Sequence, residues 1–246
     1  MKAEPVLSRV LYGNAACVVV NKLSGEAVEG ARGSAENLPQ KLAEVLRTHT
    51  PFPSAVHRID VPVTGCVLFA LTSEASVFLN TAFVEEPSSV TKKYWAIVEK
   101  PSFFPPLNGE LVHWIETNSQ RNKSYAHDEE SPSRKKAVLR YRIAGEGRNY
   151  FFVTVELLTG RHHQIRAQLA AVGLHIKGDL KYGAKRSEKS GGIRLHARSL
   201  SFPDPLNKQE RIRVIADPPV MDNLWEAFRD IESGKNFTTN STNKNE

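Results

Sequence analysis

Buried β-strands are the clearest elements that the hydrophobic pattern of this chain predicts. Apolar residues run without a break over residues 66–71, and residues 15–20 form a second run that is rich in β-branched side chains. Unbroken apolar runs of this length are typical of strands that are covered on both faces. Residues 150–158 instead alternate between apolar and polar side chains. Such alternation predicts a half-buried strand in an antiparallel sheet.

Shorter apolar segments predict the remaining strands of the sheet. They lie at residues 92–99, 109–115, 137–143, 195–202 and 211–216. Residues 11–14 are predicted to form a turn, whereas residues 117–136 lack any apolar periodicity. We therefore expect residues 117–136 to form a long mobile hairpin loop between two strands.

Two helices are predicted in the first half of the chain, where apolar residues recur at helical spacing after residues that favour helix starts. Ser34 is the expected cap of a helix that continues to Arg47, with Pro39 in its first turns or delaying its start. Thr72 or Ser73 is the expected cap of the second helix.

Two further helices are predicted in the second half of the chain. The polar segment 159–166 leads into the first of them, which buries Ile165, Leu169 and Val172 and ends at Gly173, since glycine is favoured just after a helix. The last helix is expected to be capped by Asp217, with Pro218 at its first position.

Strands outnumber helices in this pattern, and many strands are joined by short connections. That arrangement predicts an α+β fold with a mixed, mostly antiparallel central sheet flanked by helices. We expect residues 1–232 to form a single domain. Residues 233–246 are rich in Asn, Thr, Lys and Ser, and they are predicted to be a disordered polar tail.

The composition adds a basic charge and a cellular compartment to this prediction. The chain of 246 residues carries a net charge of +6, which favours a polyanionic partner without proving one. Its two cysteines, Cys17 and Cys66, each lie in a predicted strand, which suggests a reducing compartment. Because no secretory signal or bilayer-length apolar run is visible, we expect a cytoplasmic protein without membrane contact.

Several catalytic motifs are absent from the sequence. It has no His-Glu-x-x-His or Cys-x-x-Cys spacing, so no metal site is expected, and it has neither a phosphate-binding glycine loop nor Gly-x-Ser-x-Gly. What remains is one carboxylate, Asp60, in a polar loop before an apolar run, and loops on a buried scaffold often carry chemistry. The competing interpretation is that Arg58 and Asp60 form a solvated ion pair at a turn.

Five blocks of sequence occur in the order found in a known enzyme family. They are His57-Arg58-Ile59-Asp60 with Thr64-Gly65; Lys92-Lys93-Tyr94-Trp95-Ala96; Leu158-Thr159-Gly160-Arg161-His162-His163-Gln164-Ile165-Arg166; Gly173 with Gly178-Asp179 and Tyr182-Gly183; and Leu195-His196-Ala197. Together these blocks resemble the motifs of the RluA-type RNA pseudouridine synthases, over about residues 6–219. Among the departures, His162 replaces a usual threonine and adds a titratable group near the expected site.

The resemblance implies the pseudouridine synthase catalytic fold, with a cleft across the sheet, and isomerisation of a specific uridine in rRNA or tRNA to pseudouridine without a cofactor. Asp60 matches the catalytic aspartate of the family and would act as a nucleophile or as a base on a sugar proton. Arg166 would keep Asp60 ionised through a charge-assisted hydrogen bond. Tyr94 would stack on the uracil, Arg58 would fill the gap left in the RNA, and Leu195 would line the pocket.

RNA is the expected partner, and it would be bound by a monomer. The candidate RNA-binding residues lie in the same blocks and are His57, Lys92, Arg161, His162 and Gln164. Clustered lysines and arginines would contact phosphates, which supplies affinity rather than sequence choice. The loops at residues 117–136 and 185–192 are the candidates for choosing the target.

Alternative interpretations stay open at this point. Tyr94 and Leu195 also fit an ordinary sheet aromatic and an ordinary core leucine. The chain as a whole also fits a non-catalytic RNA-binding module, or an RNA nuclease that uses His162 and His163 as acid and base. The combination of Asp60 with basic residues disfavours a pure binder, which has no need for an isolated acid in a basic cleft.

Overall fold

The computed structural model describes residues 5–30, 36–48, 53–85, 88–189 and 191–234. Its strands are β1 (Val10–Gly13), β2 (Cys17–Lys22), β3 (Glu26–Ala27), β4 (Glu36–Asn37), β5 (Ser54–Ala55), β6 (Thr64–Ala70), β7 (Thr91–Glu99), β8 (Asn108–Asn118), β9 (Lys123–His127), β10 (Lys135–Glu146), β11 (Tyr150–Leu157), β12 (Leu195–Pro203) and β13 (Arg211–Ile215). Its α-helices are α1 (Leu38–Leu46), α2 (Ser73–Val84), α3 (Gln164–Ala171) and α4 (Asn223–Glu232).

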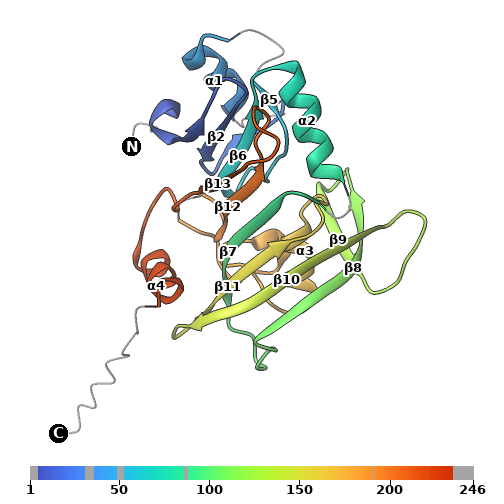
Figure 1. The fold of residues 1–246 in the computed structure, drawn as a ribbon. Helices are drawn as coiled ribbons and strands as arrows, with labels where there is room; N and C mark the ends of the chain where they lie inside the picture. Colours follow the sequence, from blue (N-terminus) through green and yellow to red (C-terminus); the bar gives the residue numbers. More distant parts are fainter. Residues whose placement is uncertain (1–4, 31–35, 49–52, 86–87, 190, 235–246) are drawn as a thin grey trace, which may run out of the picture.

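Within the described residues, all strands except β3 and β4 belong to one eleven-stranded sheet. The order along this sheet is β1-β2-β6-β12-β7-β11-β10-β8-β9, with β13 beside β12 and β5 beside β6. Figure 1 shows the N-terminal strands at one end and the long strands β8, β10 and β11 towards the other. Every pair in this sheet is antiparallel except β6 with β12. The predicted α+β fold with a mostly antiparallel sheet is therefore confirmed.

Helices cover both faces of the sheet because successive strand residues point to opposite sides. Val67 of β6 belongs to the same core cluster as α1 and α3, whereas Leu68 packs in a cluster with α2. Tyr94 of β7 likewise faces the α3 side, and Trp95 packs with Phe228 of α4. Helices α1 and α3 thus lie on one face, and α2 and α4 lie on the other.

The structure places the first turn later than the sequence predicted. Residues 10–13 form β1, paired with β2, where a turn was predicted at residues 11–14. The reversal instead begins at Asn14, whose side-chain oxygen accepts hydrogen bonds from the backbone N–H groups of Ala16 and Cys17 at 2.9 Å each. Pairing with the buried strand β2 therefore extends the sheet into residues that resemble a turn.

The predicted loop at residues 117–136 contains a strand. β8 continues to Asn118, β9 pairs with it as a hairpin, and β10 begins at Lys135. Ser124 of β9 is buried, and its hydroxyl lies 2.9 Å from Nδ1 of His162. A short strand held by polar contacts of this kind leaves no apolar periodicity in the sequence.

The starts of the first two helices follow the residues that cap them. Asn37 caps α1, and Pro39 occupies the second position of the helix, in its first turn, which is one of the two predicted alternatives. The predicted cap Ser34 lies outside the described residues. Thr72 caps α2, and Gly173, with a φ of +77°, follows the end of α3, as predicted.

The last helix begins later than predicted. Asp222 caps α4 by accepting a hydrogen bond from the backbone N–H of Trp225 (3.2 Å), whereas Asp217 and Pro218 lie in the preceding connection. Asp217 instead forms an ion pair with Arg198 of β12. The later residues of the predicted tail, 235–246, lie outside the described residues.

None of the helices in the described part of the chain is long and apolar enough to cross a membrane. Cys17 and Cys66 are free thiols buried in strands, as the apolar runs predicted. Burial raises the pKa of both thiols to about 12, so both stay protonated and unreactive.

Strands β6 and β12 meet at Gly65, which has a φ of +115° and lies opposite Ala197 in the parallel register. A Cβ atom on Gly65 would lie only 2.3 Å from the carbonyl oxygen of Ala197. Only glycine fits both this backbone conformation and this space. The close approach sets the loop that carries Asp60 beside the start of β12, where Leu195 lies.

We therefore expect Gly65→Ala to lower the free energy of unfolding by about 3 kcal/mol or more. Gly25→Ala is the matched control, because Gly25 also has a positive φ (+92°) but has nothing within 4 Å of an added Cβ. Its cost should be about 1 kcal/mol, from backbone strain alone. Urea denaturation of both variants measures the difference, and equal losses would show that the contact with Ala197 is unimportant.

Candidate active site

A cleft of about 960 Å³ lies over β7, β10 and β11, beside the loop that precedes β6. All ten residues that the sequence predicted to contact the substrate or RNA line this cleft: His57, Arg58, Asp60, Lys92, Tyr94, Arg161, His162, Gln164, Arg166 and Leu195. They come from the loop before β6, from β7, from the start of α3 and from β12. The fold thus brings together residues that are far apart in the sequence.

Asp60 lies in a tight turn whose backbone is held by hydrogen bonds. The backbone N–H of Val63 donates to the carbonyl oxygen of Asp60 (2.9 Å). Inside the turn, the carbonyl oxygen of Val61 accepts hydrogen bonds from the N–H of Gly25 (2.9 Å) and from Nζ of Lys22 (3.0 Å). Lys22 is completely buried, and burial lowers the pKa of its amine to about 7. These bonds hold the backbone of the turn while the Asp60 side chain faces the cleft.

Arg166 lies between two carboxylates. Its Nε and Nη2 donate to Asp179 (2.7 and 2.9 Å), and its Nη1 donates to Oδ2 of Asp60 (3.1 Å). Arg166 and Asp179 are almost fully buried, whereas the side chain of Asp60 remains 22% exposed. Burial alone would lower the pKa of Arg166, but its bonds to the two carboxylates outweigh this effect and raise the pKa. A permanently charged guanidinium therefore faces Asp60 at the edge of the cleft.

Arg58 pairs with Glu29 rather than with Asp60. Its Nη1 lies 2.7 Å from Oε2 of Glu29, and both side chains are more than half exposed. The interpretation in which Arg58 and Asp60 pair with each other is therefore wrong. Exposed ion pairs contribute only about 0–1 kcal/mol, so Arg58 can exchange Glu29 for another anion at little cost.

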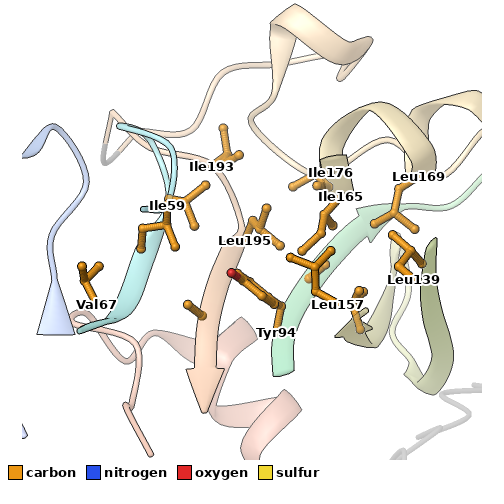
Figure 2. Packing of buried hydrophobic residues seen from close by; sticks show 14 of the residues in the cluster. Ile59, Val67, Tyr94, Leu139, Leu157, Ile165, Leu169, Ile176, Ile193 and Leu195 are labelled. Atoms are coloured by element: carbon orange, nitrogen blue, oxygen red, sulfur yellow. The ribbon is translucent and has the colours of Figure 1, made fainter. Parts of the chain in front are cut away.

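Tyr94 and Leu195 form an apolar wall beside Asp60. Figure 2 shows Tyr94 of β7 lying among Ile59, Leu157 and Leu195. Burial, together with the negative charge of Asp60, raises the pKa of Tyr94, so its phenol stays protonated. Tyr94 and Leu195 are both buried in the core, as the alternative interpretations of the sequence predicted, and both also line the cleft.

His162 and His163 stack on each other, with ring centroids 3.8 Å apart. Nδ1 of His162 lies 2.9 Å from the hydroxyl of Ser124, and Nδ1 of His163 lies 2.9 Å from the hydroxyl of Tyr182. Nε2 of His163 is 3.8 Å from Oδ2 of Asp60. Burial lowers the pKa of both rings, that of His163 to about 2, so neither is protonated at neutral pH.

His57 and Lys92 form another part of the wall, next to Phe83 of α2. The His57 ring stacks on Phe83 with centroids 5.0 Å apart, and its Nε2 accepts a hydrogen bond from the N–H of Leu68 (3.1 Å). Burial, followed by the charge of Lys92, lowers the pKa of His57 to about 3. Burial and then the neighbouring Arg161 lower the pKa of Lys92. Lys92 and Arg161, and not the neutral His57, are therefore the sources of positive charge here.

Gln164 turns inward, although the sequence predicted that it contacts RNA. Its Oε1 accepts hydrogen bonds from the hydroxyl of Thr159 (2.8 Å) and the N–H of Arg161 (2.9 Å). Its Nε2 donates to the carbonyl oxygen of Val138 (3.1 Å) and to Oε1 of Gln168 (2.9 Å). These four bonds use the full capacity of a buried amide. We therefore assign Gln164 to shaping the loop that carries Arg161.

Three residues of the site were not singled out from the sequence: Lys22, Asp179 and Tyr182. Asp179 and Tyr182 lie in the fourth block of the resemblance, which was a signal, but their contacts with Arg166 and His163 depend on the fold. In the part of the chain that the structure describes, no group of three or more His, Cys, Asp or Glu side chains is placed to hold a metal ion.

Comparison with known proteins identifies the family to which this chain belongs. The model of the RNA pseudouridylate synthase family matches residues 16–171, which is more than half of the chain. The human protein RNA pseudouridylate synthase domain containing 4 has a similar fold, with a TM-score of 0.68 and 24% identity over 92% of this chain and 93% of that protein.

Two sequence relatives match along almost their whole length. An uncharacterised RNA pseudouridine synthase of Zymomonas mobilis is 30% identical over 229 residues, which are 92% of this chain and 99% of that protein. The tRNA pseudouridine synthase C of Haemophilus ducreyi is 30% identical over 233 residues, 88% of this chain and 92% of that protein. The chain therefore belongs to the RNA pseudouridylate synthase family. It is an RNA pseudouridine synthase of the RluA type, and thus an isomerase.

We predict that Asp179→Asn lowers the free energy of unfolding by about 3 kcal/mol or more, because it leaves a buried guanidinium without its main charged partner. Asp60→Asn is the control, and it should change the free energy of unfolding by less than about 1 kcal/mol, because Asp60 faces the cleft. Urea denaturation at neutral pH measures both values. An Asp179→Asn protein that is as stable as the wild type would contradict the anchoring role of Asp179.

Proposed function

We propose that this enzyme isomerises a uridine of ribosomal or transfer RNA to pseudouridine, with Asp60 as the catalytic residue. The observation that carries the proposal is the Asp60 carboxylate in the cleft, 3.1 Å from the buried guanidinium of Arg166. Relatives support the substrate class: one is the tRNA pseudouridine synthase C noted above, and others are ribosomal large subunit pseudouridine synthases C and D.

The reaction makes defined demands on the site. The bond from C1′ of the ribose to N1 of uracil must break, and the uracil must turn while it is still held. C1′ then bonds to C5, C5 loses its proton, and N1 gains one. Asp60 would act either as a nucleophile at the sugar or as a base on a sugar proton. Both roles need an ionised carboxylate, and Nη1–H of Arg166 donates a hydrogen bond to Oδ2 of Asp60 (3.1 Å).

Tyr94 and Leu195 would hold the detached uracil ring. Their side chains form an apolar surface next to Asp60, and a protonated phenol presents a flat face on which a base can stack. An apolar wall also excludes water from the sugar while the glycosidic bond is open. The wall therefore supports rotation of the uracil without its loss from the cleft.

The exposed and basic residues of the rim would bind the surrounding RNA. Arg58 would leave Glu29 and fill the gap that the uridine leaves when it turns out of the RNA stack. Lys92 and Arg161 would contact phosphates, which attract basic side chains regardless of sequence. His162 lies at the same rim, and its neutral ring would contact a base or sugar rather than a phosphate.

The nuclease alternative finds little support in the geometry. An acid and base pair needs one histidine that is protonated near neutral pH. Burial lowers the pKa of both His162 and His163. Nδ1 of His162 is hydrogen-bonded to Ser124, and Nδ1 of His163 is hydrogen-bonded to Tyr182. The two rings therefore suit a supporting role better than proton transfer.

Release of tritium from uracil carbon 5 tests the proposal. RNA labelled at that position should lose tritium to water when the wild-type enzyme is present, and the RNA chain should stay intact. Asp60→Asn should slow this release by about 1,000-fold or more, because the amide is neither a nucleophile nor a base.

Glu110→Gln is the matched control, since it neutralises another carboxylate at the cleft that is paired with Arg140 near the surface. It should release tritium at the wild-type rate. Release by Asp60→Asn at the wild-type rate would contradict the role of Asp60. Shortened RNA would favour a nuclease, and binding without release would favour a non-catalytic module.

A further inference from the structure

The two nitrogen donors that face Asp60 approach the same carboxylate oxygen. Nη1 of Arg166 lies 3.1 Å from Oδ2, and Nε2 of His163 lies 3.8 Å from Oδ2. Among the described residues, none forms a hydrogen bond with Oδ1 of Asp60. One oxygen of the carboxylate is thus held by the protein, and the other is available to the substrate.

Hydrogen bonding orients the ring of His163. Its Nδ1 lies 2.9 Å from the hydroxyl of Tyr182, and this hydroxyl also accepts a hydrogen bond from the N–H of Ser124 (2.8 Å). The single hydrogen of the Tyr182 hydroxyl has two acceptors within reach, Nδ1 of His163 at 2.9 Å and the carbonyl oxygen of Ser124 at 3.1 Å. The negative charge of Asp60 favours a hydrogen on Nε2. The charge of Asp60 thus favours the form of His163 in which Nε2–H faces Asp60 and Nδ1 accepts the hydrogen of Tyr182.

His163 also stays neutral in this environment. Its side chain is buried, and burial followed by the charge of Arg166 lowers its pKa to about 2. The neighbouring His162 and Lys181 act in the same direction. A neutral imidazole can donate a hydrogen bond to Asp60 without transferring a proton to it. The carboxylate would therefore remain available for catalysis.

We propose that His163 is a positioning residue for the reaction, whose Nε2–H group binds Oδ2 of Asp60 once RNA fills the cleft. His163 and Arg166 together would leave Oδ1 as the oxygen that acts on the substrate. The inference rests on the proposed function. Hydrogen bonds at catalytic groups are often long before substrate binds and shorten in the complex. Here a movement of about 1 Å would bring Nε2 and Oδ2 to hydrogen-bond distance.

Two substitutions of His163 separate this role from a structural one. The backbone of His163 has a φ of +52°, a conformation that asparagine tolerates better than glutamine does. The amide nitrogen of asparagine can reach only the place of Nδ1, whereas that of glutamine reaches the place of Nε2. If His163 has only a structural role, His163→Asn should therefore be the more active variant. If His163 donates a hydrogen bond to Asp60, His163→Gln should be the more active variant.

We expect His163→Asn to slow single-turnover release of tritium by about 10-fold to 100-fold, which is the effect of losing one hydrogen bond to a charged group. His163→Gln should restore most of the wild-type rate, while both variants bind RNA as tightly as the wild type. The proposal is wrong if His163→Gln is as slow as His163→Asn, or if His163→Asn keeps the wild-type rate.

Tyr182→Phe provides a second test that does not depend on the folding of the His163 variants. It keeps the ring that lies 4.8 Å from the guanidinium carbon of Arg166, and it removes the hydroxyl that orients His163. Its single-turnover rate should fall by about 10-fold, and an unchanged rate would overturn the proposal. Failure of the proposed function would appear differently, as a wild-type enzyme that releases no tritium at all.

Discussion

The buried guanidinium of Arg166 is the group on which the site depends. A cation that is 4% exposed is stable in a protein only when anions and hydrogen-bond acceptors surround it. Asp179 satisfies two of its nitrogen atoms, so its third nitrogen is directed towards Asp60 and the cleft. The guanidinium of Arg166 is planar, so its two bonds to Asp179 fix the direction of its third nitrogen. The contact with Asp60 follows from that direction.

The sheet supplies the rigidity that this arrangement needs. Asp60 precedes β6 and Leu195 begins β12, and the parallel contact of these strands at Gly65 fixes one residue relative to the other. The buried amine of Lys22 holds the turn that carries Asp60. Because each element is anchored in the core, the cleft is largely formed before RNA binds. Small rotations of side chains, rather than movements of strands, would then complete the site.

Much of this organisation could be predicted from the sequence, because it depends on local patterns. The unbroken apolar run at residues 66–71 marked the buried strand β6, and Thr72 and Gly173 marked helix ends. The collinear motifs brought Asp60, Tyr94 and Arg166 to attention, and the fold places all three in one cleft.

What could not be predicted depends on contacts between distant segments. Local sequence offers Asp217 as a helix cap, but its pairing with Arg198 and the capping by Asp222 appear only in the folded chain. Gln164 resembles an RNA-binding residue in a basic segment, yet burial and four internal hydrogen bonds turn it inward.

Arg166→Lys tests the central claim most directly, because lysine keeps the charge but cannot bond to Asp179 through two nitrogens while reaching Asp60. In folded protein that binds RNA as tightly as the wild type, the single-turnover rate of tritium release should fall by about 100-fold, and a rate within about threefold of the wild type would contradict the account.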